Sequence, residues 1–213
     1  GARPKACWMY PIQVTANNGN TQRVWWWEAN SDGYNINNGL NESSRVEANN
    51  TNGVITAHAS GEGTSTVFSV KEGNSSFENV NHSSQNYMAI CWKEVQGFSK
   101  FGSFKGNGDD NGAFVYCGFK PALVMIRAMD RAEGTFCYDN GRNPINDDTS
   151  YIMGVNDNQR HFADTNTRFD FVSNGFKLRD NGPARNTNGT VYGFCAWAEN
   201  PLVTSKGAPC PAK

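Results

Sequence analysis

The sequence has no long apolar run and almost no net charge. No stretch of about 18 consecutive apolar residues occurs in the 213 residues, which argues against a membrane-spanning helix. Lys and Arg number 19 and Asp and Glu number 20, which gives a formal net charge of −1. A balanced charge supplies no bulk attraction to nucleic acid or to an anionic membrane surface. We therefore expect neither a nucleic-acid nor a membrane partner.

The short motifs of common catalytic and metal chemistry are also missing. No Gly-x-Ser-x-Gly elbow occurs, so the usual serine hydrolase signature is absent. The six cysteines form no Cys-x-x-Cys pair and the three histidines lie far apart, so no zinc site is indicated. Gly106, Gly108 and Gly112 miss the dinucleotide fingerprint by one residue. We therefore predict a protein that is not an enzyme.

A sustained apolar period of 3.6 residues is missing as well, so almost no helix is expected. Asn and Gly are instead the commonest residues, and both favour tight turns. The apolar runs between the turns are rich in β-branched and aromatic residues, as strands are. The two central runs are 113–119 and 122–129, and Asn174-Gly175 is the strongest hairpin signal. The other expected strands lie at 23–29, around Asn52-Gly53, and at 66–70, 86–95, 135–138, 151–155 and 190–198.

These strands predict an all-β protein, an antiparallel β-sandwich of lectin-like or jelly-roll type spanning residues 1–213 as one domain. A short internal sequence repeat indicates an alternative arrangement of this domain. Tyr87-(x4)-Trp92-x-Glu94 matches Tyr192-(x4)-Trp197-x-Glu199. Two half-repeats, 12–95 and 96–203, with irregular terminal arms would account for the short internal repeat. The segment from Gly1 to Pro11 is expected to be such an arm.

The six cysteines allow up to three bridges. Cys91, Cys117 and Cys195 lie in apolar runs, where a buried thiol is common. Cys7 and Cys210 lie near the two ends of the chain in proline-containing segments. We predict a disulfide between Cys7 and Cys210 if the chain contains one bridge.

One segment resembles part of a metal site. Asn107, Asp109 and Asn111 place oxygen atoms at alternate positions before Gly112, as in the first half of a calcium-binding loop. The twelfth position is Gly118, so the closing Glu of such a loop is missing. Calcium is therefore a possible ligand, and the alternative is a plain hairpin loop; no other cofactor is expected.

Several motifs together carry a family resemblance over about residues 86–203. They are GFSKFGSFKGNG at 97–108, AFVYCGFKPALVMIR at 113–127, Asn143-Pro144, SNGFKLR at 173–179 and AWAENP at 196–201. In this combination the chain resembles an uncharacterised domain found in the tail and tail-fibre proteins of marine phages. The resemblance implies a virion-associated β-sandwich, lectin-like in shape, and brings no catalytic residues with it.

We therefore expect a phage virion protein, on the tail or the capsid exterior, that works by binding as a homo-oligomer among other virion proteins. The first hypothesis is an adhesin for host surface glycan, because aromatic faces and polar loop side chains suit sugars. Trp8, Tyr34, Tyr138 and Tyr151 are the aromatic residues expected near loops. The alternative is a capsid or tail decoration protein that works through protein–protein contacts. A glycan-degrading enzyme is a weaker third hypothesis, and it requires two carboxylates in a cleft.

Overall fold

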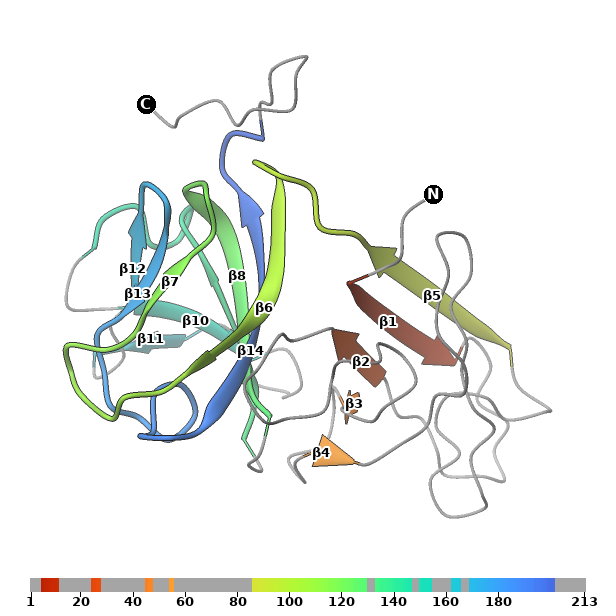
Figure 1. Cartoon of the computed structure of the whole chain (residues 1–213), viewed down its shortest axis with the longest axis horizontal. Coiled ribbons are helices and arrows are strands. Elements are labelled where there is room, and N and C mark those ends of the chain that lie inside the picture. Colours follow the sequence, from red (N-terminus) through yellow and green to blue (C-terminus); the bar gives the residue numbers. More distant parts are fainter. Residues whose placement is uncertain are drawn as a thin grey trace.

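The protein is built from strands throughout the part of the chain that the structure describes. The computed structural model describes residues 5–11, 24–27, 45–47, 54–55, 86–129, 133–146, 150–154, 162–165 and 169–201 (Figure 1). These residues form fourteen strands and no helix, as the apolar pattern predicts. None of them belongs to a helix long and apolar enough to cross a membrane.

The largest element is a six-stranded sheet in which every neighbouring pair is antiparallel. Its two longest strands, of eight residues each, are neighbours inside the sheet. The spatial order is β11 (Phe162–Asp164), β10 (Ser150–Gly154), β9 (Thr135–Asp139), β8 (Pro121–Ala128), β14 (Val191–Ala198) and β6 (Ser99–Lys105). β6 is therefore an edge strand of this sheet.

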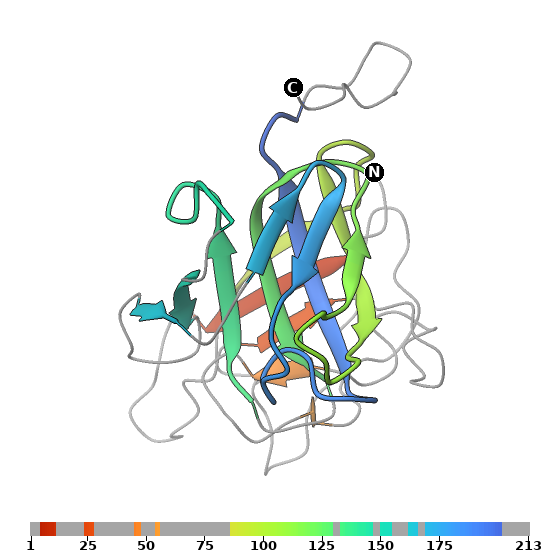
Figure 2. The same cartoon turned by 90° about the vertical axis from the view of Figure 1, so that its left-hand side faces the viewer.

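A three-stranded antiparallel sheet packs face to face on the six-stranded one, and together they form the β-sandwich that the sequence predicts (Figure 2). Its order is β12 (Phe169–Val172), β13 (Gly175–Leu178) and β7 (Phe114–Tyr116). β7 and β6 are thus edge strands of the two layers, and both border the same side of the sandwich.

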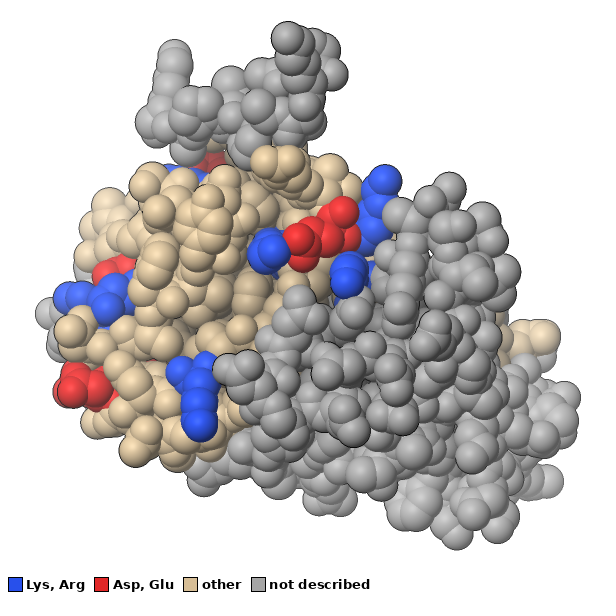
Figure 3. Space-filling view, in the orientation of Figure 1, with Lys and Arg blue, Asp and Glu red and all other residues tan. Residues whose placement is uncertain are grey.

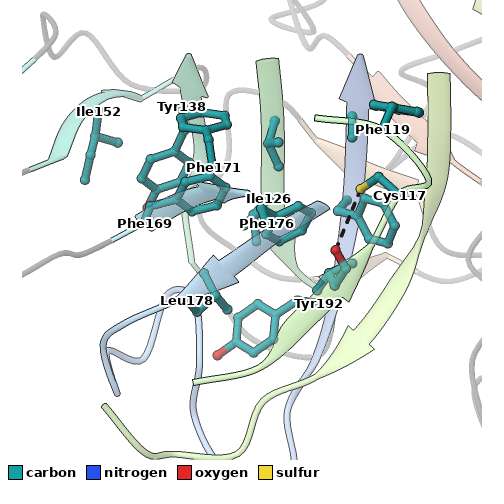
Figure 4. Close-up of a cluster of buried hydrophobic side chains, with 14 of the residues drawn as sticks. Cys117, Phe119, Ile126, Tyr138, Ile152, Phe169, Phe171, Phe176, Leu178 and Tyr192 are labelled. Carbon is teal, nitrogen blue, oxygen red and sulfur yellow. Dashed lines mark hydrogen bonds between the residues drawn. The ribbon is translucent and has the colours of Figure 1, made fainter. Parts of the chain in front are cut away.

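Aromatic side chains from both sheets fill the space between them (Figure 4). Phe169 and Phe176 of the small sheet stack with ring centroids 5.2 Å apart, and Phe169 also stacks on Tyr138 of the large sheet at 4.3 Å. Phe176 continues the series with an edge contact to Phe194 at 5.5 Å. Each such pair contributes about 0.5–1.5 kcal/mol beyond the burial of its area, so this row of rings joins the layers.

The outer face of the six-stranded sheet is covered too. A second apolar cluster there contains Met125, Cys195 and Ala6 of β1 (Ala6–Pro11), with Trp92 of β5 (Tyr87–Trp92) packed against it. Trp92 meets Trp197 edge to face at 6.0 Å. Burial on both faces explains why β14, and β8 apart from its buried Arg127, lack the alternation of apolar and polar residues of a half-exposed strand.

β1 and β5 belong to a five-stranded antiparallel sheet beside the sandwich (Figure 1). Its order is β4 (Val54–Ile55), β3 (Arg45–Glu47), β2 (Val24–Trp27), β1 and β5. The prediction of an irregular segment from Gly1 to Pro11 is wrong for its second part, because β1 pairs with β2 on one side and with β5 on the other. Pro11 is tolerated because it ends the strand.

Two further expectations need adjustment. The predicted hairpin exists, but Val172 pairs with Gly175, so the turn residues are Ser173 and Asn174. The two strands of the short internal repeat occupy different places, since β5 ends its sheet while β14 lies between β8 and β6. Most of residues 12–85, including the strand expected at 66–70, lies outside the described residues, so the half-repeats stay a prediction.

Three cysteines lie in the cores and are expected to be inert in the folded protein. Burial raises the pKa of the Cys117 and Cys137 thiols to about 12, and it raises the pKa of Cys195 further. At pH 8 a thiol with a pKa of about 12 is ionised in only about one molecule in ten thousand. We expect no alkylation of these sites by iodoacetamide at pH 8 until denaturant is added, as measured by mass spectrometry.

The same pKa shifts predict how the stability of the folded protein depends on pH. The unfolded chain releases these protons near pH 8.5, whereas the folded chain retains them to about pH 12. Their contribution to stability is therefore complete below about pH 8.5 and is lost as the pH rises toward 12. For the alkylation test described above, rapid modification of the three thiols in the native protein at pH 8 would contradict their burial.

Candidate functional site

A groove of about 370 Å³ opens on the side of the sandwich where β6 and β7 face each other. Side chains and backbone of both strands line it, together with Lys5 and Glu94. Two aromatic residues of β7 stand at its rim, with Phe114 50% exposed and Tyr116 63% exposed. Val115 between them points into the core, because side chains alternate along a strand. The groove therefore combines exposed aromatic rings with polar surroundings.

The backbone of β7 also faces this groove. Leu178 donates its N–H to the carbonyl of Ala113 at 3.0 Å, and Cys117 donates to that of Asn174 at 2.9 Å. Bonding alternates along an antiparallel pair, so the odd-numbered residues of β7 bond to β13. The N–H and C=O groups of Phe114 and Tyr116 point the other way, toward the groove. They have no hydrogen-bond partner within the described part of the chain.

The opposite edge of the small sheet is closed by side chains. Asn146 accepts the N–H of Phe171 at 2.9 Å and donates to its carbonyl at 3.0 Å, as a neighbouring strand would. The hydroxyl of Ser150 accepts the N–H of Phe169 at 3.1 Å. Edge strands are usually protected in such ways. Because β12 is covered and β7 is open, the geometry singles out the β7 edge as a binding surface.

Charged groups lie at one end of the groove. Lys100 of β6 forms an ion pair with Glu94 at 2.8 Å, and both side chains are about one-third exposed. The second carboxylate oxygen of Glu94 lies 3.5 Å from the N–H of Phe101, which points outward from β6. Among the described residues on the face shown in Figure 3, charged side chains form small separate groups with uncharged surface between them. The site thus offers aromatic rings, backbone hydrogen-bonding groups and one ion pair.

The four aromatic residues predicted to contact a ligand do not gather at this groove. Tyr138 is fully buried and stacked on Phe169, so it is a core residue and that prediction is corrected. Tyr151 is 41% exposed on β10, in a part of the six-stranded sheet away from β6 and β7. Trp8 lies in β1, where the structure describes its backbone only, and Tyr34 lies outside the described residues.

Sequence reasoning missed Phe114 and Tyr116 because they belong to an apolar run that resembles buried core. The usable signal was alternation, since Phe114 and Tyr116 share one face of the strand and Val115 the other. Which of the two faces is covered depends on β13 and on the six-stranded sheet, and those partners are distant in sequence.

The predicted calcium ligands lie in a loop that is stabilised by hydrogen bonds within the loop and from Asn186. Asn107 accepts the N–H of Asp109 at 3.1 Å, and Asp109 accepts that of Asn111 at 2.7 Å. The buried side chain of Asn186 donates to the same Asn107 oxygen at 2.8 Å, which occupies both of its lone pairs. In this conformation the side-chain oxygen of Asn107 is occupied by two donors, and its use by a cation would require a donor such as Asn186 to move. The calcium site stays a prediction.

Some of the residues that carry the family resemblance stabilise turns. Gly97 has a φ of 74°, and the Ser99 hydroxyl next to it accepts the N–H of Val95 at 3.1 Å. Asn143 is buried and bonds to both backbone groups of Tyr151, which fastens the turn after β9 to β10. These motif residues therefore stabilise turns of the scaffold, whereas Lys100, Phe114 and Tyr116, which also lie in the motifs, line the groove.

The comparisons with known proteins identify a family of unknown function. A family model described as Domain of unknown function (DUF7483) matches residues 55–201, about two thirds of the chain. The match includes the whole sandwich and all the described lining residues of the groove except Lys5. No curated protein and no solved structure matches the chain. On the extent of the family match, the chain belongs to the family described as Domain of unknown function (DUF7483).

Proposed function

We propose that the protein is a binding component of a phage particle, in the tail or a fibre, and that it attaches to host surface glycan through the β6–β7 groove. The observation that carries the proposal is the exposed pair Phe114 and Tyr116 at the rim of a polar groove. A virion location is supported by the resemblance of the motifs at 97–127 and 173–201 to marine phage tail domains.

The groove offers the groups that bind sugars. Aromatic rings pack against the apolar face of a pyranose, and polar groups bind its hydroxyls. The outward N–H and C=O groups of Phe114 and Tyr116 and the ends of Lys100 and Glu94 can supply those hydrogen bonds. Glu94 is the one carboxylate among the described lining residues, whereas glycoside hydrolysis usually needs two. Binding without cleavage therefore fits the site better than hydrolysis.

Single sugar contacts of this kind are weak, so function would depend on many copies. Several linked sites can raise avidity about a hundredfold or more. We accordingly propose a homo-oligomer or a many-copy virion part. Protein coupled to beads should bind bacterial surface polysaccharide, and free protein at the same concentration should bind far less.

The Phe114→Ala, Tyr116→Ala double variant is expected to lose glycan binding. Removing both rings deletes the platform but leaves Val115 and the pairing with β13 in place. Loss of central aromatic contacts typically costs more than 1 kcal/mol, so bead-bound protein should bind polysaccharide about tenfold less or weaker still. Binding is measured on an array of bacterial polysaccharides, with circular dichroism as a check on folding.

Tyr151→Ala is the matched control, since it removes an exposed tyrosine from another part of the large sheet. It should bind polysaccharide as the unchanged protein does. Equal binding by the double variant, or loss only in the Tyr151 variant, would move the site away from the groove. Release of soluble sugar would show an enzyme instead.

The alternative function is a capsid or tail decoration protein, and the open edge of β7 favours it. An uncovered strand edge can bind an extended segment of another protein through backbone hydrogen bonds. This function predicts that bead-bound protein ignores every polysaccharide but binds empty capsids or tails. In that case the side chains of Phe114 and Tyr116 would contribute less to binding of capsids or tails than their backbone N–H and C=O groups.

A further inference from the structure

We infer that Cys7 and Cys91 are joined by a cross-strand disulfide when the protein is oxidised. Cys7 lies in β1 and Cys91 in β5, and the two are direct partners in the antiparallel register. The flanking pairs, Ala6 with Trp92 and Trp8 with Ile90, continue the same register on both sides. The inference replaces Cys210 as the partner of Cys7, and it does not depend on the proposed glycan site.

The backbone distance suits a disulfide. Directly opposed residues on antiparallel strands share one face of the sheet, and their Cα atoms are about 4.5–5.5 Å apart. Disulfides join Cα atoms about 4.4–6.8 Å apart. The register is therefore compatible with a bridge at this position.

The three buried cysteines are unsuitable partners for each other. Cys195 pairs with Met125, and Met125 pairs on its other side with Cys137. A whole strand therefore separates Cys195 from Cys137, which is about 9–10 Å and beyond the reach of a disulfide. Cys117 follows β7 in the small sheet, on the other side of the large one. Cys210 lies outside the described residues.

The bridge would form by thiol–disulfide exchange with an oxidised low-molecular-weight disulfide such as oxidised glutathione. One cysteine thiolate attacks the reagent and displaces one thiol, and the second cysteine then displaces the other. One S–S bond forms in the protein and one breaks in the reagent. The two protein thiols lose two electrons and two protons, and the reagent leaves as two thiols.

The position of the bridge gives it a structural consequence. Ala6 and Trp92, the pair next to it, both pack on the outer face of the six-stranded sheet. A covalent link one residue away would hold β1 and β5 together where they cover that face. It would also close a loop of more than 80 residues, and long loops give large stabilisation in the chain-entropy model.

Peptide mapping of the full chain tests the pairing directly. Trypsin places Cys7, Cys91 and Cys210 on separate peptides, 6–23, 72–93 and 207–213. After incubation with oxidised glutathione and blocking of remaining thiols, a non-reduced digest should contain 6–23 linked to 72–93. A linked peptide of 6–23 with 207–213, or a fully blocked 6–23, would overturn the inference.

Thermal unfolding supplies a second readout with matched variants. Reduction should lower the melting temperature by about 5–10 °C, the usual effect of losing a bridge in a protein of this size. Cys91→Ser should show the lower melting temperature with and without reductant. Cys210→Ser should respond to reductant as the unchanged protein does. A Cys91→Ser variant that stays sensitive to reductant, or a Cys210→Ser variant that loses sensitivity, would contradict the pairing.

Discussion

Replacing Asn186 by alanine is expected to lower the free energy of unfolding by about 3 kcal/mol or more. Asn186 is fully buried beside the loop that contains Asn107 and Asp109. Its amide nitrogen donates to the side chain of Asn107 and to the carbonyls of Asp109 and Asp180, at 2.8, 2.9 and 2.7 Å. Its oxygen accepts the N–H of Asn107 at 3.0 Å. Alanine would remove Asn186 as the partner of all four groups, and the Asn107 side-chain oxygen would keep the N–H of Asp109.

Two further variants sharpen this prediction. Asn186→Asp keeps the size of the side chain but places an oxygen where the nitrogen now faces three acceptors, so it should destabilise at least as much at pH 7. Asn188→Ala, two residues away and exposed, should change stability by less than about 0.5 kcal/mol. Urea denaturation measures all three. Equal stability of the Asn186 and Asn188 variants would show that the buried amide does not hold the loop.

Gly175→Ala is expected to destabilise the sandwich by about 3 kcal/mol or more and to weaken ligand binding with it. Gly175 is not among the glycines with positive φ, so its backbone conformation does not require glycine. The lack of space at this position requires glycine, because an added Cβ would lie 2.0 Å from the carbonyl oxygen of Val115 and 3.0 Å from its carbonyl carbon. Both are backbone atoms of β7, so the strand that carries Phe114 and Tyr116 would have to move.

Gly141→Ala is the control for this change. Gly141 lies in the turn after β9, and its added Cβ would meet only the side chain of Asp139, at 3.3 Å. Its effect on the urea midpoint should be small. If Gly175→Ala unfolds at the same urea concentration as the unchanged protein and binds the same polysaccharide, β7 is not held against Gly175 as described.

Local signals were sufficient to predict most strands of the sandwich. The runs that became β8 and β14 and the hairpin at 169–178 depend on residue type and on turns between neighbours in sequence. The candidate site was not predictable in the same way. Tyr138 and Tyr116 are the same residue type in short strands, yet one is fully buried and the other is 63% exposed. Distant strands decide that difference.

The sequence by itself determined the all-β class, the antiparallel sandwich and the absence of helix among the described residues, because alternation and turn residues act over a few positions. Tertiary structure alone decided that β1 lies between β2 and β5, which places Cys7 opposite Cys91. It also decided that β7 ends its sheet with an open edge, while Asn146 and Ser150 cover β12. These outcomes depend on which strands meet across long separations, and the free energy of such pairing comes from packing that no single segment contains.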